Sequence, residues 1–414
     1  MSSFNSEYKV RAVHCDHHST DEEVYQALKR ATDPLDRAWD KLKKAKNIAI
    51  KFNQDKMLRQ LVMYENHRQQ LVSDSVVRAL LRLLRERTTA CVYVIDVSFY
   101  QVYAGAEQDS TTNIKPVLDE LGIEYVNGNV GDVRMVSVPG GGSMFDQYPL
   151  HPRAVDADAI ISVQKLKNHT FMGITLCLKN LFGLMPTQPL GHPRFYYHHL
   201  VRMPYMLADL GRIYNPTLNI LDGMVGQAGE EWGKGEHPRI CNTLVAGDHV
   251  IATDAVGAHL MGHDPQSDWL TAPFHRDRNA LLCAAESGFG TVDLNEIDWQ
   301  SEVTAPVGQF YAKTTDSVEV VTSWRRTTCE QALHYLDHRK EYTDKYAGEY
   351  VLMQMGEVRW HDTSGVLDRS RRILSGEHPE QAMWFKYVDP DETENEHYEV
   401  YERTLQTIKA MQHS

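Results

Sequence analysis

A stretch of the chain without acidic residues is the feature that most directly suggests chemistry. No Asp or Glu occurs between Asp158 and Asp209, although the whole chain has 56 of them among 414 residues. The same stretch holds these basic and imidazole side chains: Lys165, Lys167, Lys179, Arg194, Arg202, His169, His192, His198 and His199. Because the formal net charge is −13, they concentrate positive potential in one place, and a cleft would focus it on an anionic ligand. The alternative is a basic surface patch without a ligand.

Two lysines and a histidine alternate at the end of a predicted strand. In an extended chain, Lys165, Lys167 and His169 point to one face. Their positive groups repel one another unless an anion lies between them, which favours a carboxylate or phosphate site. We predict that Lys165 and Lys167 bind substrate and that His169 is catalytic. The alternative is that the lysines reach solvent and that His169 caps the next helix.

The run GITLCLKNLFG after this strand has apolar residues at helical spacing and ends at Gly183, which predicts a helix. Lys179 and Asn180 interrupt its apolar face. A lysine embedded in this way needs an anionic partner if it is buried. We therefore predict a catalytic role for Lys179 and substrate binding by Asn180. Alternatively, the lysine stem packs on the helix and its head reaches water.

Several other residues could complete such a site. Asp222 is predicted to be catalytic, and Asn53 and Arg194 are predicted to bind substrate. Two or three histidines with a carboxylate suit zinc or non-haem iron, so His192, His198, His199 and Glu230 are candidate ligands of a divalent metal. The HCDHH run at residues 14–18 is more typical of a polar loop, because adjacent residues rarely all reach one ion.

Alternating strands and helices would position these side chains. Strands are predicted within residues 47–52, 91–99, 123–126, 158–166, 218–223 and 242–248, and helices within 19–31, 75–87 and 113–121. This order predicts an α/β fold, with a mostly parallel sheet covered by helices on both faces. Ligands of such folds bind beyond the carboxyl ends of the strands, where Asn53, Asp96, Lys165, Asp222 and Asp248 would lie.

The sequence changes character after about residue 305. Residues 345–362 predict two strands around a turn at Gly356, and residues 364–388 predict a helix and then a strand. We therefore expect an α/β ligand-binding or catalytic domain over residues 1–305, which could consist of two lobes, and a small α+β domain over 306–414.

Composition excludes several classes of protein. The net charge of −13 argues against nucleic acid or an anionic membrane as a partner, and a small anionic molecule is expected instead. No apolar run approaches the roughly 20 residues that span a bilayer, and no signal peptide opens the chain. The six cysteines lie far apart without a C-x-x-C motif. A reduced, cytoplasmic protein is expected, and a homo-oligomer is compatible with the sequence.

Several motifs occur in the order of a known family. KLKNH, GITLCLKNLFGLMP, LNILDGMVGQAGE and LVAGDHVIATDAVGAHLMG resemble the motifs of the domain-of-unknown-function family numbered 362, over residues of about 45–305. Many members carry a ferredoxin-like four-iron–four-sulfur module. This chain lacks the required cysteine spacing, so no iron–sulfur cluster is expected. The tail at about residues 345–390 resembles a second, uncharacterised domain type.

These features predict an enzyme that acts on a small carboxylate- or phosphate-bearing metabolite by acid–base or metal-assisted chemistry. An isomerase, a lyase or a metal-dependent oxidoreductase would fit. The alternative is a binding or carrier protein for an anionic metabolite, which would need only the cations. Histidines and acids among the lysines favour the enzyme.

Overall fold

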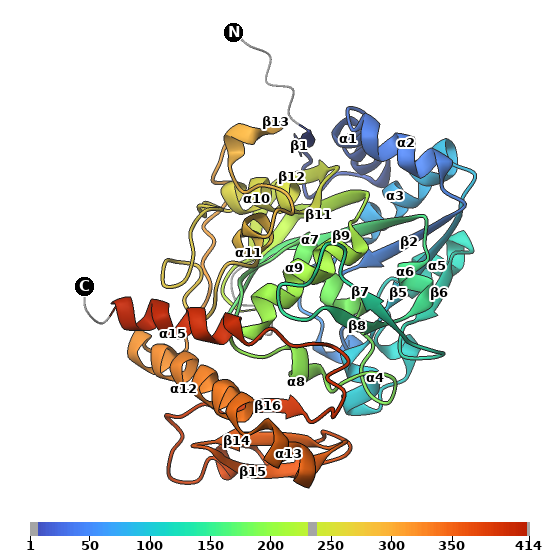
Figure 1. Ribbon diagram of the computed structural model, residues 1–414. Helices are drawn as coiled ribbons and strands as arrows, with labels where there is room; N and C mark the ends of the chain where they lie inside the picture. The colour runs from blue at the N-terminus through green and yellow to red at the C-terminus, as the bar shows by residue number, and fades with distance from the viewer. Residues whose placement is uncertain (1–6, 231–237, 412–414) are drawn as a thin grey trace.

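The computed structural model describes residues 7–230 and 238–411, and a large mixed sheet forms its centre (Figure 1). The strand order is β13-β1-β12-β11-β9-β2-β5-β6, and β10 pairs with β9. The strands are β1 (Tyr8–His14), β2 (Asn47–Phe52), β5 (Cys91–Asp96), β6 (Glu124–Asn127), β9 (Ala159–His169), β10 (Gly173–Thr175), β11 (Leu218–Gln227), β12 (Pro238–Gly247) and β13 (Ile297–Ser301). Neighbours along the run β11-β9-β2-β5-β6 are all parallel, so the predicted α/β class is confirmed.

Helices cover both faces of this sheet (Figure 1). On one face lie α1 (Asp21–Thr32), α2 (Asp36–Lys44), α3 (Asp74–Arg87) and α5 (Lys115–Leu121); on the other lie α7 (Cys177–Asn180), α9 (Arg202–Tyr214), α10 (Val250–Leu260) and α11 (Ala280–Glu286). A hydrophobic core lies on each face of the sheet, and successive residues of a strand point into one core and then the other. In β2, Ile48 and Ile50 pack with the first group of helices, and Ala49 packs with the second. This alternation explains why the strands are apolar throughout.

Local signals placed several elements correctly. Thr20 accepts a hydrogen bond from the Glu23 backbone, and Glu23 accepts one from the Thr20 backbone, which forms a capping box at the start of α1. Gly122 ends α5 in the left-handed conformation before β6 begins. The helices predicted within residues 19–31 and 113–121 are thus confirmed.

Two predictions about strand and helix geometry are wrong. Asp248 was expected beyond the carboxyl ends of the parallel strands, but β12 runs antiparallel to β11, so Asp248 lies at the other end of the strands, where it accepts a hydrogen bond from the Lys9 backbone. The segment from Gly173 was expected to be one helix, but it begins with β10, in which Thr175 pairs with Lys167. Only α7 and a 3₁₀ turn at Leu181–Leu184 are helical there. The β-branched residues Ile174 and Thr175 favour pairing with β9 over helix formation.

Shorter elements surround the carboxyl ends of the parallel strands and the edge of the sheet. They are η1 (Leu58–Gln60), β3 (Met63–Tyr64), β4 (His67–Arg68), α4 (Phe99–Ala104), η2 (Gln108–Ser110), β7 (Arg134–Ser137), β8 (Gln147–Leu150), α6 (Pro152–Val155), α8 (Arg194–Tyr197) and η4 (Leu294–Glu296).

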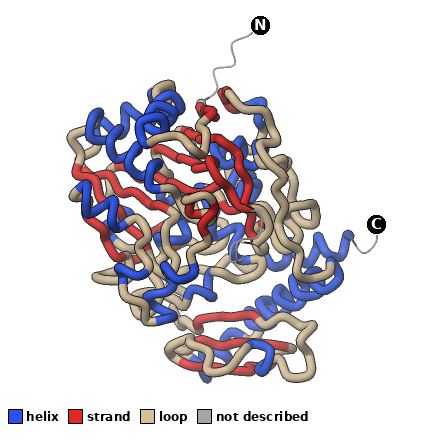
Figure 2. The backbone as a smooth tube through the Cα atoms, turned by 180° about the vertical axis from the view of Figure 1, so that it is seen from behind, coloured by secondary structure: helices blue, strands red, loops and turns tan. Residues whose placement is uncertain are grey.

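The last part of the chain forms a small α+β unit, drawn in orange and red in Figure 1 and seen from behind in Figure 2. An antiparallel sheet of order β15-β14-β16 packs with its helices. The elements are α12 (Val318–Asp337), α13 (Arg339–Tyr346), β14 (Tyr350–Gln354), β15 (Glu357–Asp362), α14 (Arg371–Leu374), β16 (Trp384–Tyr387) and α15 (Glu399–Met411). The predicted hairpin at Gly356 and the helix before a strand are confirmed; the domain boundary near residue 305 stays a prediction. Within the described residues, no helix combines the length and apolar character needed to cross a membrane.

Candidate functional site

A large cavity lies between the α/β body and the C-terminal unit. Its volume is about 1360 Å³, above the several hundred Å³ typical of small-molecule sites. Its lining residues are Lys56, Arg59, Gln60, Leu61, Val62, Met63, Phe99, Tyr100, His169, Phe171, Lys179, Arg194, Phe195, His198, Arg276, Leu367, Arg369, Ser370 and Arg371. We call this space the cavity. It has room for a ligand considerably larger than a simple carboxylate.

The lining of the cavity is strongly cationic. Seven of these residues are Lys or Arg, and no described Asp or Glu is among them. The acid-free stretch supplies Lys179 and Arg194, whereas Arg276 and Arg371 come from segments far away in the sequence. In a protein with a net charge of −13, such a lining concentrates positive charge in one place.

Aromatic rings support three of the arginines. The Arg194 guanidinium lies 4.5 Å from the centre of the Phe182 ring, and Arg276 lies 4.0 Å from that of Phe171. Arg371 lies 5.8 Å from the centre of the Phe195 ring. A ring beneath a guanidinium orients it and leaves its N–H donors, which lie in the plane of the guanidinium, accessible to a ligand.

A smaller pocket adjoins the cavity. Its volume is about 80 Å³, and it shares Lys56, Phe99, Tyr100, Lys179 and Arg194 with the cavity. Its other lining residues are Lys51, Asn53, Asp55, Gln70, Leu71, Asp96, Val97, Gln164, Lys167, Thr175, Asn180, Phe182 and Gly183. We call this space the recess.

The sheet topology explains the position of the recess. Along the chain, β2 is followed by β5 and β6 on one side, and then by β9 and β11 on the other. The side on which new strands are added to the sheet therefore changes at β2. As a result, the loops that follow the neighbouring parallel strands β2 and β9 lead to opposite sides. Asn53, just after β2, and Lys167, in the last part of β9, both line the recess at this point.

A glycine makes room for a buried ion pair in the recess. Lys51 Nζ lies 2.8 Å from Asp96 Oδ1, and both side chains are buried. A Cβ atom at Gly183 would lie 2.3 Å from Lys51 Cε, so any larger residue there would displace the lysine. The Gly183 carbonyl also accepts a hydrogen bond from the Val97 backbone. Gly183, the residue that ends the KNLFG motif, therefore leaves the space that Lys51 occupies.

The predicted substrate-binding residues Lys167, Asn53 and Asn180 lie together in the recess. Lys167 Nζ donates to Asn53 Oδ1 at 3.2 Å and to the Gln70 carbonyl at 3.2 Å. The Asn180 amide donates to the Lys51 carbonyl at 2.9 Å and to Ser162 Oγ at 3.0 Å. Asn180 therefore ties α7 to β2 and β9, which places Lys179 between the recess and the cavity.

Two of the predicted histidines lie side by side in the cavity. The rings of His169 and His198 have their centres 6.0 Å apart. His169 Nδ1 accepts hydrogen bonds from the backbones of Phe171 and Met172, at 3.0 and 3.2 Å. In the neutral ring the proton is therefore on Nε2. His169 both orders the turn after β9 and belongs to the cavity lining.

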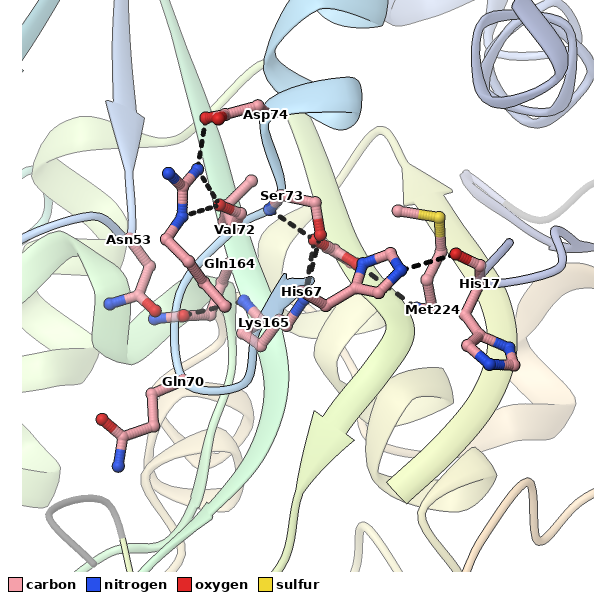
Figure 3. A network of polar contacts seen from close by, with 12 residues as sticks. His17, Asn53, His67, Gln70, Val72, Ser73, Asp74, Gln164, Lys165 and Met224 are labelled. Carbon is pink, nitrogen blue, oxygen red and sulfur yellow. Dashed lines mark hydrogen bonds and ion pairs between the residues drawn. The ribbon is translucent and has the colours of Figure 1, made fainter. Parts of the chain in front are cut away.

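Lys165 and Asp222 have a structural role instead of the predicted roles in substrate binding and catalysis. Lys165 Nζ lies 2.9 Å from Asp222 Oδ2, and both side chains are fully buried. Figure 3 shows Lys165 in the polar network beside Ser73. Asp222 also accepts a hydrogen bond from the Ser73 backbone at 2.8 Å. Burial opposes ionisation of Asp222, but Lys165 and Ser73 outweigh it and lower the pKa of this carboxyl group. The pair joins β9 and β11 to the start of α3, away from the cavity and the recess.

The four predicted metal ligands do not form one group. His192 is held by Tyr350 and Glu394, Glu230 pairs with Lys313, and His199 lines, together with His198, a pocket that adjoins the cavity. Burial lowers the pKa of His199 to about 3. Within residues 7–230 and 238–411, the one group of three metal-ligand side chains close enough to share an ion is Asp16, His17 and His18. His17 there is already engaged by Asn242 and Glu65.

Several residues of the site were not predicted. Asp55 and Lys56 follow Asn53 beyond β2, and their position after a strand was the available signal. Arg276, Arg369 and Arg371 lie in irregular segments or a one-turn helix, and no local pattern distinguishes them.

The chain is similar to proteins of known sequence or structure over parts of its length. It is 31% identical over 144 residues to a thylakoid-associated protein of Synechocystis sp., covering 32% of this chain and 43% of that protein. The chain thus spans less than half the length of this relative. The lactate racemase apoprotein from Thermoanaerobacterium thermosaccharolyticum superposes with a TM-score of 0.39 at 14% identity, over 63% of this chain and 58% of that one.

The sequence also matches a protein family that is described as a domain of unknown function, DUF362. The match extends over residues 48–259, just over half of the chain, and contains β2, β5, β9 and β11 together with α7. These are the elements that build the recess and much of the cavity. The chain belongs to the DUF362 family.

Proposed function

We propose that the protein is an enzyme that acts on an anionic small molecule, bearing carboxylate or phosphate groups, by acid–base chemistry in the cavity. The observation that carries this proposal is a 1360 Å³ cavity lined by seven Lys and Arg residues and by no described acidic residue. Leu61, Phe171 and Phe195 give part of its wall an apolar character, which suits a ligand with an apolar or aromatic portion.

Proton transfer within the cavity is the second part of the proposal. His169 and His198 bring two imidazole rings, the side chain most often used for proton transfer, and Lys179 lies between the cavity and the recess. A positioned acid and base beside a cationic clamp stabilise the negative charge that forms when a substrate loses a proton. Isomerisation and elimination are the reaction classes that fit this arrangement.

Ligand binding tests the first part. A panel of phosphate- and carboxylate-bearing metabolites is screened by thermal shift, and hits are measured by calorimetry at low and high salt. Arg371→Gln removes one cation of the cavity wall, and we expect about tenfold to a hundredfold weaker binding, as for the loss of a charge-assisted hydrogen bond. Arg326→Gln on the exposed face of α12 is the matched control and should bind as the wild type does. Equal affinities for all three proteins would contradict the proposal.

Turnover separates an enzyme from a carrier. Each bound compound is incubated with the protein in deuterated water and examined by mass spectrometry. Deuterium incorporation or conversion is expected of an acid–base enzyme, whereas tight binding without either would identify a carrier.

A further inference from the structure

The recess has the size and charge of a site for a single anionic group. Its volume of about 80 Å³ corresponds to a few water molecules, or to one carboxylate or phosphate group. Lys51, Lys56, Lys167, Lys179 and Arg194 all line it. The wider cavity begins where the recess ends, so a ligand could place its anionic group in the recess and its remaining part in the cavity.

Two carboxylates line the same recess, and their surroundings differ. Asp96 is held on both oxygens: Lys51 lies 2.8 Å from Oδ1, and Gln54 Nε2 donates to Oδ2 at 2.6 Å. Asp55 instead accepts from Ser98 Oγ at 2.5 Å and from the Phe99 backbone at 3.0 Å, and Asp55 is only partly buried. Asp96 is thus a fixed anion paired with Lys51, while Asp55 is held in place by neutral donors at the rim of the recess.

We infer that the recess binds the anionic group of the substrate and that Asp55 is the catalytic residue that exchanges a proton with the adjacent substrate atom. This inference rests on the proposed function. The Asp55 carboxylate takes a proton from a C–H or O–H group beside the bound anion and becomes a carboxylic acid. The electron pair stays on the substrate, where the lysines stabilise it. Return of the proton to another atom or face restores Asp55 and releases an isomer, so no oxidant or reductant is needed.

The electrostatics of the recess agree with this role. Burial and, after it, the neighbouring Asp96 carboxylate raise the pKa of Asp55 to about 7, against the opposing hydrogen bonds from Ser98 and Phe99 and the charge of Lys51. Both protonation states are then populated at neutral pH, as proton transfer requires. The charged and titratable groups that line or face the recess around Asp55 are Lys51, Lys56, Asp96, Tyr100, Tyr125, Lys167, Lys179 and Arg194.

Sulfate is a suitable probe, because its charge stays at −2 across the neutral pH range. Calorimetry of the full chain from about pH 6 to 8 should show sulfate binding that weakens as Asp55 ionises near pH 7. Asp55→Asn should bind sulfate about tenfold more tightly than the wild type at pH 8, because a negative charge beside the anion is gone. Ser98→Ala removes a hydrogen bond to ionised Asp55 and should move the midpoint upwards. Asp132→Asn, on an exposed loop, should match the wild type.

The outcomes distinguish the possible failures. Unchanged sulfate affinity in Lys167→Met would place the anion elsewhere and overturn the recess as its site. Superimposable pH profiles for the wild type, Asp55→Asn and Ser98→Ala would overturn the role of Asp55, even if one variant folded poorly. Loss of deuterium exchange in Asp55→Asn with retained binding of a cavity ligand supports the inference. The proposed function has a separate readout, because Arg371→Gln should weaken binding of large ligands and leave sulfate binding unchanged.

Discussion

At the scale of single residues, His169 is the clearest case in which one side chain has two roles. Its Nδ1 accepts the backbone N–H groups of Phe171 and Met172, and its ring lines the cavity beside His198. The first role is structural and resembles a cap, and the second is the proton transfer proposed for the cavity. The two roles need different atoms, because a cap needs only an acceptor whereas proton transfer needs a titrating nitrogen.

The substitution His169→Asn separates these roles. Asn keeps an acceptor for the turn, so the free energy of unfolding should change by less than about 1 kcal/mol. Turnover should fall by about a hundredfold or more, as expected for the loss of a general acid or base. Steady-state kinetics and urea unfolding measure the two quantities. A stable variant with wild-type turnover would remove His169 from the mechanism.

At the scale of elements, α7 depends on a residue of another helix. Asp254, in the middle of α10, accepts hydrogen bonds from the backbones of Cys177 and Leu178, at 2.9 and 2.7 Å. Asp254 therefore caps α7 and not its own helix. α7 has only four residues, so it relies on this contact to present Lys179.

Removing this cap should affect both stability and the site. Asp254→Ala leaves two buried N–H groups without an acceptor, which should cost about 1–3 kcal/mol for each group that stays unpaired. Binding of sulfate and of cavity ligands should weaken as well, because Lys179 is no longer held. Thr20→Ala, at the start of α1, should cost about 1 kcal/mol and leave binding intact. Chemical unfolding measures the stability of both variants, and calorimetry measures their ligand binding. If the two variants bound ligands equally well, α7 would not contribute to the site.

At the scale of the whole molecule, the C-terminal unit is joined to the body by a buried ionic network. Arg202, at the start of α9, lies 2.8 Å from Glu396, and Lys386 lies 3.0 Å from the same carboxylate. All three side chains are buried. The unit also contributes Arg369 and Arg371 to the cavity. The cavity is therefore complete only when the unit is docked.

Glu396→Gln should loosen this connection. Buried Arg202 loses its carboxylate partner, and Lys386 keeps only Glu392, 3.0 Å away, at a cost of about 3–5 kcal/mol. Although burial opposes ionisation, Arg202 and Lys386 lower the pKa of Glu396 to about 2. In the unfolded chain the pKa of a glutamate is about 4.3. Because the pKa of Glu396 is lower in the folded protein, its ionised form stabilises the fold at pH values above about 4.3, and this stabilisation is lost as the pH falls towards 2. The difference in unfolding free energy between the wild type and the variant should therefore be constant from about pH 5 to 8 and shrink below about pH 4.

The exposed residue Glu399 supplies the control for this experiment. Glu399→Gln, at the start of α15, should unfold as the wild type does at every pH. A Glu396→Gln variant as stable as the wild type at pH 7 would show that the network adds no net stability.

Sequence by itself determined the α/β class, the mostly parallel sheet, a helix within residues 19–31 and the C-terminal hairpin, because apolar periodicity and turn residues act over a few positions. It also predicted that Lys167, Lys179, Arg194 and His169 belong near an anion, because a charge vacancy is visible along the chain. Only the tertiary structure decided that Lys165 pairs with Asp222, since β9 and β11 become neighbours through folding. Folding also places Asp55 and Lys167 in the same recess, and Arg194 and Arg371 in the same cavity. Sequence could not predict these neighbours, because they come from segments that are far apart along the chain.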